Sequence, residues 1–309
     1  MPSNTISPSL DQGMLQNFQS SFFHLAQQQK SYLESSRAVI HLPSKGKTNN
    51  FARIGRLNLI EVNTRNPDKQ YADYALDNRQ LTKRRFTLTV QIDAKYDINE
   101  LIADPTSDIL QNLVKAKGRT IDRVIVAAAV GTVLTGSSDA ALTSTSAATD
   151  GVITVDASAG LTYEKIQEVT QNFINNDLGY DMIKGTMLCI TGSENTDLMS
   201  EVKFISSDYI SGRPVETGMM TSAGTYMVTL FAGSVLGGIT VSSPILPEGA
   251  TLRDCVALAP ESIAVAMEAN LLGVEKSATK VNSWDITIDL WLNAMRTEGV
   301  RVQKIQTTI

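Results

Sequence analysis

The longest regular pattern of apolar positions predicts a single long helix between Asp104 and Leu134. Apolar side chains recur there at intervals of three and four, the spacing of one helical face; they are Leu110, Leu113, Val114, Ile121, Val124, Ile125 and Ala128. Asp104 can cap the N-terminus, and Pro105 suits the first helical position. A helix of roughly 28 residues would be about 42 Å long, so another layer must lie along it. Gly118 costs about 1 kcal/mol relative to alanine, so we expect another backbone to approach the helix there.

Two stretches with a period of two predict strands before this helix. They are Phe51–Asn63 and Leu81–Ala94, and the polar connection Thr64–Gln80 contains Asn66-Pro67-Asp68, a turn sequence. We therefore expect one long hairpin with a loose tip. A two-stranded ribbon is marginally stable in water, so it needs another surface to lie on, which another subunit could supply.

The N-terminal segment predicts a narrow apolar stripe on a helix. Its apolar residues are again three and four apart: Leu15, Phe18, Phe22 and Leu25. A stripe this narrow is typical of a helix that docks on a partner. The break around Pro43 and Gly46 separates it from the hairpin, so residues 1–45 are expected to form an arm rather than a domain.

The second half of the chain predicts a mixed α/β unit followed by long strands. After the polar stretch Thr135–Gly151, we expect a helix over Leu161–Asn176, a buried strand over Gly185–Thr191, and a helix capped by Ser193 or Asn195. Further strands are expected at Tyr226–Phe231, Gly238–Val241, Cys255–Ala259, Ser262–Glu268, Ser283–Ala294 and Val300–Ile305. Residues 152–252 should therefore form a compact domain.

Composition and charge narrow the class of protein. The 309 residues, 42% hydrophobic and 19% charged, can form one large or two ordinary globular domains. Neither a signal peptide nor an apolar run near the ~20 residues of a membrane span is visible, so we expect a soluble, cytosol-made protein. Lys45–Lys95 holds 11 Lys and Arg against 5 Asp and Glu, a balance of +6, which leaves −11 for the rest of a chain whose net charge is −5. This segment could be a solvated basic hairpin or a surface that seeks acidic partners.

No constellation of catalytic, cofactor-binding or metal-ligating residues emerges. The only histidines, His24 and His41, lie in the N-terminal arm, and Cys189 and Cys255 sit among apolar neighbours, as buried small hydrophobes do. Neither a phosphate-binding loop nor metal-ligand spacing is present. Asp285 and Asp289 lie on the polar face of a predicted strand, and Thr191-Gly192-Ser193 has no nearby histidine. We expect no enzyme and no cofactor.

The order of these segments resembles the tailed-bacteriophage major capsid proteins of the HK97 fold. Three stretches carry the likeness: Met187–Phe204, with its strand, turn and helix, Leu236–Gly249, with glycines, a short strand and a Pro-Glu-Gly turn, and the ending Trp284–Ile305. The resemblance covers nearly the whole chain, although each motif alone is weak.

The resemblance implies an α+β fold with an N-terminal arm, an extended β-hairpin called the E-loop, a long spine helix in a peripheral domain, and a small α/β axial domain. The corresponding residues are 1–45 for the arm, 46–95 for the E-loop, 96–151 and 253–309 for the peripheral domain, and 152–252 for the axial domain. Candidate contacts between subunits are Leu15, Phe18, Phe22, Leu25, Lys83, Arg84 and Arg85.

The implied function is a shell protein that self-assembles as hexamers and pentamers into an icosahedral head around double-stranded DNA. Its implied partners are itself, a portal, and scaffolding or decoration proteins. DNA would be enclosed without sequence-specific binding, no membrane would be involved, and the protein would be made in the host cytoplasm and reside in the virion. The alternatives are an encapsulin-like nanocompartment shell, an α/β enzyme, and a monomeric binding module.

Overall fold

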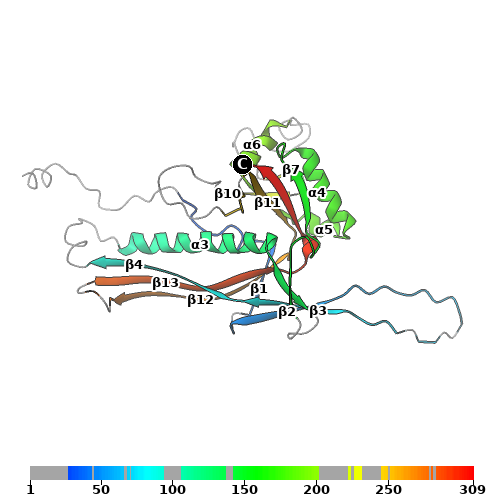
Figure 1. Ribbon diagram of the computed structural model, residues 1–309, viewed down its shortest axis with the longest axis horizontal. Helices are drawn as coiled ribbons and strands as arrows, with labels where there is room; N and C mark the ends of the chain where they lie inside the picture. Colours follow the sequence, from blue (N-terminus) through cyan, green and yellow to red (C-terminus); the bar gives the residue numbers. More distant parts are fainter. Residues whose placement is uncertain are drawn as a thin grey trace, which may run out of the picture.

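The structure is a computed structural model that describes residues 27–43, 45–65, 68–69, 71–93, 106–136, 142–201, 222–223, 226–231, 245–249, 251–277, 280 and 283–309. Three sheets and one long helix organise these residues, and a hairpin projects from one end (Figure 1).

The first sheet carries the long helix. Its strand order is β1-β12-β13-β4, with bounds β1 (Val39–Leu42), β12 (Ile263–Lys276), β13 (Ser283–Arg296) and β4 (Arg84–Asp93). Helix α3 (Thr106–Val130) lies along this sheet (Figure 1). Leu113 of α3 packs with Ile92 of β4 and Ile286 of β13. The alternation predicted for β13 is confirmed, because its apolar face is mostly buried.

The predicted long helix is present, but it ends earlier than expected. The predicted cap residues Asp104 and Pro105 lie outside the described residues. At the other end the helix stops at Val130 rather than Leu134, because Val133–Gly136 forms strand β5. An apolar run cannot by itself separate the last helical turn from a short buried strand.

The close approach expected at Gly118 is confirmed. A Cβ added there would lie 2.8 Å from the backbone nitrogen of Ser31 and 3.0 Å from the carbonyl carbon of Lys30. A side chain at this position would therefore push the crossing segment off the helix.

The second sheet has the strand order β2-β3-β5-β6 and contains the hairpin. Its strands are β2 (Thr48–Ile54), β3 (Leu76–Thr82), β5 (Val133–Gly136) and β6 (Thr143–Thr145). The expectation that Leu81–Ala94 is the returning hairpin strand is wrong. β3 pairs with β2, whereas β4 pairs with β13 over ten residues. Alternation reveals a strand but not its partner, and the chain changes sheets at Lys83.

The third sheet, with six strands, forms the body of the small α/β unit. Its order is β7-β14-β11-β8-β10-β9, with bounds β7 (Ile153–Ala157), β14 (Val302–Thr308), β11 (Leu252–Leu258), β8 (Met187–Thr191), β10 (Tyr226–Phe231) and β9 (Ser222–Ala223). The helices are α4 (Tyr163–Asn175), α5 (Tyr180–Ile183) and α6 (Gly192–Ser200), and the 3-10 turn η2 (Gly299–Arg301) precedes β14.

Several predicted elements of this unit are confirmed. The helix over Leu161–Asn176 appears as α4 with Ile166, Val169 and Phe173 buried, and β8 is buried throughout. Residues 253–309 divide between two sheets. β12 and β13 lie in the first sheet, whereas β11 lies in the third sheet, where it pairs with β14 on one side and β8 on the other. Strand Gly238–Val241 lies outside the described residues.

The predicted cap of α6 is wrong. The N-cap is Thr191 rather than Ser193 or Asn195, and it forms a capping box with Glu194. Thr191 also ends a strand, so its capping role was hidden by the apolar run before it.

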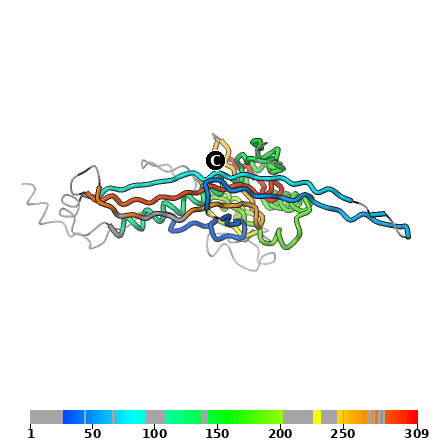
Figure 2. Tube along the Cα trace, turned by 90° about the horizontal axis from the view of Figure 1, so that it is seen from below, coloured from blue at the N-terminus to red at the C-terminus, as the bar shows by residue number. Residues whose placement is uncertain are grey.

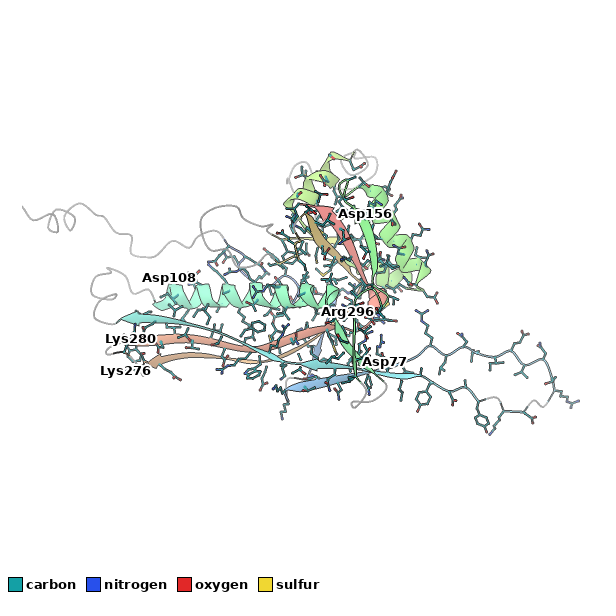
Figure 3. The ribbon with its side chains drawn as sticks, viewed as in Figure 1. Asp77, Asp108, Asp156, Lys276, Lys280 and Arg296 are labelled. Carbon is teal, nitrogen blue, oxygen red and sulfur yellow. The ribbon has the colours of Figure 1, made fainter. Side chains whose placement is uncertain are left out.

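A buried ionic cluster joins the root of the hairpin to the rest of the fold. Arg79 of β3 and Arg296 of β13 are both inaccessible to solvent, and Asp150 lies between them. Arg79 Nη1 donates to Asp150 Oδ2 at 2.9 Å, and Arg296 Nε donates to the same oxygen at 3.2 Å. Figure 3 labels Arg296 where α3, β13 and the hairpin root meet.

Arg296 also caps the C-terminal end of α3. Its Nη1 donates to the carbonyl oxygens of Ala128 and Ala129 at 3.1 and 3.0 Å, and to that of Gly131. These carbonyls form the negative end of the helix dipole. Because Arg79 and Arg296 share a single carboxylate, the dipole partly compensates the excess positive charge. Burial lowers the pKa of the Arg296 guanidinium, while its hydrogen bond to Asp150 opposes that shift.

Replacing Asp150 with asparagine tests whether this cluster holds the junction together. The variant would leave two buried guanidinium groups without a countercharge, so we expect the free energy of unfolding to fall by about 3 to 5 kcal/mol. Urea unfolding at constant oligomeric state measures the loss. Asp156→Asn is the control, since Asp156 is exposed on β7, and its unfolding midpoint should stay near that of the parent. Equal midpoints for both variants would show that the cluster contributes little.

Candidate functional site

The hairpin continues past its paired strands as an extended arm. β2 and β3 pair from Thr48 with Thr82 to Ile54 with Leu76, and just beyond, Gly55 N donates to Ala75 O at 2.8 Å. We call the described residues 55–65, 68–69 and 71–75 the hairpin arm. Figure 2 shows both of its sides extending well beyond the body of the molecule.

The arm and its root expose large apolar side chains. Leu59 is fully exposed and Tyr71 is 89% exposed. The whole set, including both flanking strand ends, is Ile54, Leu57, Leu59, Ile60, Val62, Tyr71, Tyr74 and Leu76. Single exposed apolar side chains are common on soluble proteins, but such a concentration of large ones on one projecting segment is typical of an interaction surface.

This surface was not predicted, because the alternation of Phe51–Asn63 indicates a strand lying on one other surface and the connection after Asn63 is polar in sequence. A signal was nevertheless present. Between Phe51 and Asn63 apolar residues occupy both alternating faces, with Leu57 and Leu59 on one and Ile60 and Val62 on the other. A ribbon that lay on a single surface would keep one polar face.

Part of the positive charge of the Lys45–Lys95 segment is compensated within the chain. Four cations pair with carboxylates outside the segment, namely Arg56 with Asp177, Arg79 with Asp150, Lys83 with Glu268, and Arg85 with Asp289. Arg53 pairs with Asp77 inside it. Five of the eleven cations of the segment therefore form ion pairs within the subunit, and attraction between subunits stays a prediction for the others.

The three predicted basic contact residues differ in environment. The side chain of Lys83 is buried, and its Nζ lies 2.8 Å from Glu268 Oε2. Arg84 is exposed and donates to Asn293 Oδ1 at 3.3 Å. Arg85 is exposed and forms an ion pair with Asp289 at 2.7 Å. Arg84 and Arg85 are therefore available at the surface, whereas Lys83 serves the interior of the subunit.

The pair Asp285 and Asp289 is structural. The hydrogen bond from Arg85 lowers the pKa of the Asp289 carboxyl group, and Asp285 accepts a hydrogen bond from Gln91 at 3.1 Å. Both lie on the polar face of β13, as the alternation of the strand predicts.

The other predicted contacts, Leu15, Phe18, Phe22 and Leu25, lie outside the described residues. Gln27, the first described residue, contacts α3: its Nε2 donates to Asn112 Oδ1 at 2.6 Å.

A second buried polar cluster stabilises the small unit. Arg253 Nη1 lies 3.1 Å from Glu194 Oε1 and its Nε lies 2.8 Å from Glu248 Oε1, while Thr307 donates to Glu194 at 2.7 Å. Burial alone would raise the pKa of Glu194, but hydrogen bonds from Thr191, Thr307 and the backbone outweigh it and lower that pKa below its ordinary value of 4.5. The Thr191 turn thus belongs to a structural cluster.

The cysteines are buried, as the sequence predicted, and burial raises the pKa of both the Cys189 and Cys255 thiols. Within the described ranges, no group of three His, Cys, Asp or Glu residues is arranged to hold a metal ion. The described helices include none long and apolar enough to cross a membrane.

Comparison with known proteins places the chain. A model of the family described as phage capsid protein matches residues 10–309. The chain belongs to the phage capsid protein family. The predicted resemblance to tailed-phage capsid proteins is confirmed, and the role of this capsid protein is structural rather than enzymatic. It is a shell-forming subunit of the virion, and the encapsulin-like alternative is not favoured.

Solved structures agree with the family in fold. A chain of Mycobacterium phage Che8 has 13% identity and a TM-score of 0.64, with 99% of this chain and 98% of that chain covered. The head of Helicobacter pylori bacteriophage KHP40 gives 9% identity and a TM-score of 0.67 at 99% and 98% coverage. For Gordonia phage Cozz the identity is 11% and the TM-score is 0.65, with 100% of this chain and 97% of that chain covered. Comparison with curated proteins gives no match.

Reversing the charge of Lys83 should destabilise the capsid protein itself. Lys83→Glu puts a carboxylate in a buried position beside Glu268, so we expect the free energy of unfolding to fall by about 2 kcal/mol or more, measured by urea unfolding. The double variant Lys83→Glu/Glu268→Lys should recover part of this loss. Arg85→Glu at the exposed neighbouring position should shift the unfolding midpoint little. A Lys83→Glu protein as stable as the parent would contradict the assignment.

The Glu194 cluster predicts an acid-dependent loss of stability. Because the pKa of Glu194 is lowered by folding, its carboxylate stabilises the folded state above pH 4.5, and that contribution is lost as pH falls through the lower, folded pKa. Glu194→Gln should cost about 2 kcal/mol at pH 7, and the difference from the parent should shrink as the pH falls below 4.5. Urea midpoints at pH 7 and at a series of values below 4.5 measure it, with exposed Glu164→Gln as the control. A pH-independent difference would exclude this role.

Proposed function

We propose that this capsid protein is the major subunit of an icosahedral head, arranged as hexamers and pentamers around double-stranded DNA, and that the hairpin arm is a principal contact with a neighbouring copy. The supporting observation is the exposed apolar surface of the arm. An extended two-stranded ribbon is marginally stable alone, so it gains its stability and hides its apolar side chains only when another copy covers it.

The same proposal assigns the regions of the fold. Residues 1–45 act as the N-terminal arm, 46–95 as the E-loop region, 96–151 with 253–309 as the peripheral domain, and 152–252 as the axial domain. The strand pairing supports a refinement: the reaching part is residues 48–82, and β4 belongs with the peripheral sheet. β11 and β14 complete the axial sheet, so the boundary of that domain includes them.

Exposed Arg84 and Arg85 are proposed as further contacts between subunits. The apolar residues of the N-terminal arm are proposed to act with them, namely Leu15, Phe18, Phe22 and Leu25. A portal and scaffolding or decoration proteins are proposed as partners, with synthesis in the host cytoplasm. DNA is proposed to be enclosed without sequence-specific binding, which fits a net charge of −5.

A matched pair of surface variants tests the role of the hairpin arm. Leu59→Ser/Tyr71→Ser removes an aliphatic and an aromatic side chain from the arm, and Ile174→Ser/Tyr180→Ser removes an equivalent exposed pair from the α4–α5 region, where exposures are 58% and 72%. We expect the arm variant to fold but to form few closed shells, because it loses the apolar area that a neighbour would bury.

Negative-stain electron microscopy with light scattering measures shell formation, and circular dichroism checks folding. The control variant should assemble like the parent. Closed shells at parental yield from the arm variant would overturn the assignment of the arm as a principal contact.

A further inference from the structure

The first described residues lie across the long helix as a strap. We define the strap as Gln27–Leu33. Where it crosses α3, its backbone approaches Gly118 so closely that no Cβ would fit. Arg119 Nη1 donates to Gln27 Oε1 at 2.6 Å at the outer end of this crossing. The strap therefore follows a defined track on the helix surface.

One carboxylate receives most of the polar contacts of the strap. Asp122 of α3 is fully buried, and it accepts hydrogen bonds from Ser31 Oγ at 2.6 Å and from the backbone N–H groups of Tyr32 and Leu33 at 3.0 Å each. Gln28 Nε2 donates to it as well. All four donors are uncharged groups of the strap itself, so the carboxylate is matched to this segment.

The chain changes character at Leu33, the last residue of the strap. Leu33 is buried in the main core, and Ser36 N donates to Leu33 O at 3.0 Å in the turn that leads to β1. Tyr32 stays 43% exposed, with its ring centroid 5.8 Å from that of Phe231. Residues 27–32 of the strap are thus held mainly by polar contacts to one side chain, whereas Leu33 and the chain after it are held by apolar burial.

We propose that the strap is a releasable element and that the Asp122 carboxylate is its latch. When the latch is closed, residues 27–32 of the strap lie fixed on α3, with Leu33 anchored in the core. When it is open, those residues leave α3 while the sheets stay folded, because the core contacts begin at Leu33. The value of this device for shell closure rests on the proposed function; the latch itself does not.

Replacing Asp122 with asparagine tests the latch with almost no change in volume. The amide nitrogen of the variant would face N–H and O–H donors and would accept none of their hydrogen bonds. Hydrogen exchange by mass spectrometry, on the full chain before assembly, should show exchange in the strap at least tenfold faster than in the parent. Trypsin cleavage after Lys30 should accelerate to a similar degree, and exchange in β13 should stay unchanged.

Two further variants keep the proposal testable if Asp122→Asn does not fold. Gly118→Ala should release the strap sterically with the carboxylate intact, and Ser31→Ala, which removes one of four donors to Asp122, should give a smaller acceleration. Exposed Asp181→Asn is the control and should leave strap exchange unchanged. Parental exchange in Asp122→Asn, or in both other variants, would overturn the latch, as would faster exchange throughout the body.

Assembly of the same proteins separates this inference from the proposed function. Malformed or incomplete shells from a variant with a released strap and an intact body would support a role for the latch in shell closure. Normal shells from that variant would overturn this role while leaving the latch in place. Failure of the parent itself to form shells would count against the proposed function alone.

Discussion

The buried contact of Asp150 with Arg79 and Arg296 is the constraint on which the shape of the subunit depends. It joins the returning strand of the hairpin, the end of β13 and the last turn of α3 at one point. Gly299 approaches the same loop so closely that a Cβ there would lie 2.1 Å from the Asp150 carbonyl oxygen. A hairpin that reaches away from the body needs such a root, because its own two strands cannot set its direction.

Around this root several charged side chains are buried, whereas large apolar side chains of the hairpin arm are exposed. Arg79, Lys83 and Arg296 are buried and paired inside the subunit, while the hairpin arm presents leucine, isoleucine and tyrosine to solvent. Buried ion pairs contribute little net stability compared with apolar packing, but they tolerate few alternative geometries. We infer that they fix the direction of the arm, and that burying the arm in an assembly supplies stability that the free subunit lacks.

The charge pattern also gains its meaning from this arrangement. A segment with a balance of +6 on a body of −11 suggested attraction between copies. The ion pairs of Arg56, Arg79, Lys83 and Arg85 use part of that charge to hold the hairpin root and β4 on their own subunit. Beyond its root, the hairpin arm combines exposed apolar side chains with the exposed cations Arg65 and Lys69.

The spacing of apolar residues along the sequence was enough to predict those elements that bury one regular face. The α3 helix, the inward face of α4, the strands β8 and β13, and the close approach at Gly118 all follow from residue spacing and from the cost of glycine in a helix. The segment order also identified the family, because that order reflects the architecture.

Tertiary structure alone decided which elements meet. Whether β3 or β4 completes the hairpin, whether Lys83 is buried, and where α3 gives way to β5 depend on partners that are distant in the sequence. The gathering of Arg79, Asp150 and Arg296 depends on the same long-range pairing. Alternation and charge are local properties, whereas strand partners and buried ion pairs depend on which distant segments the packed core brings together.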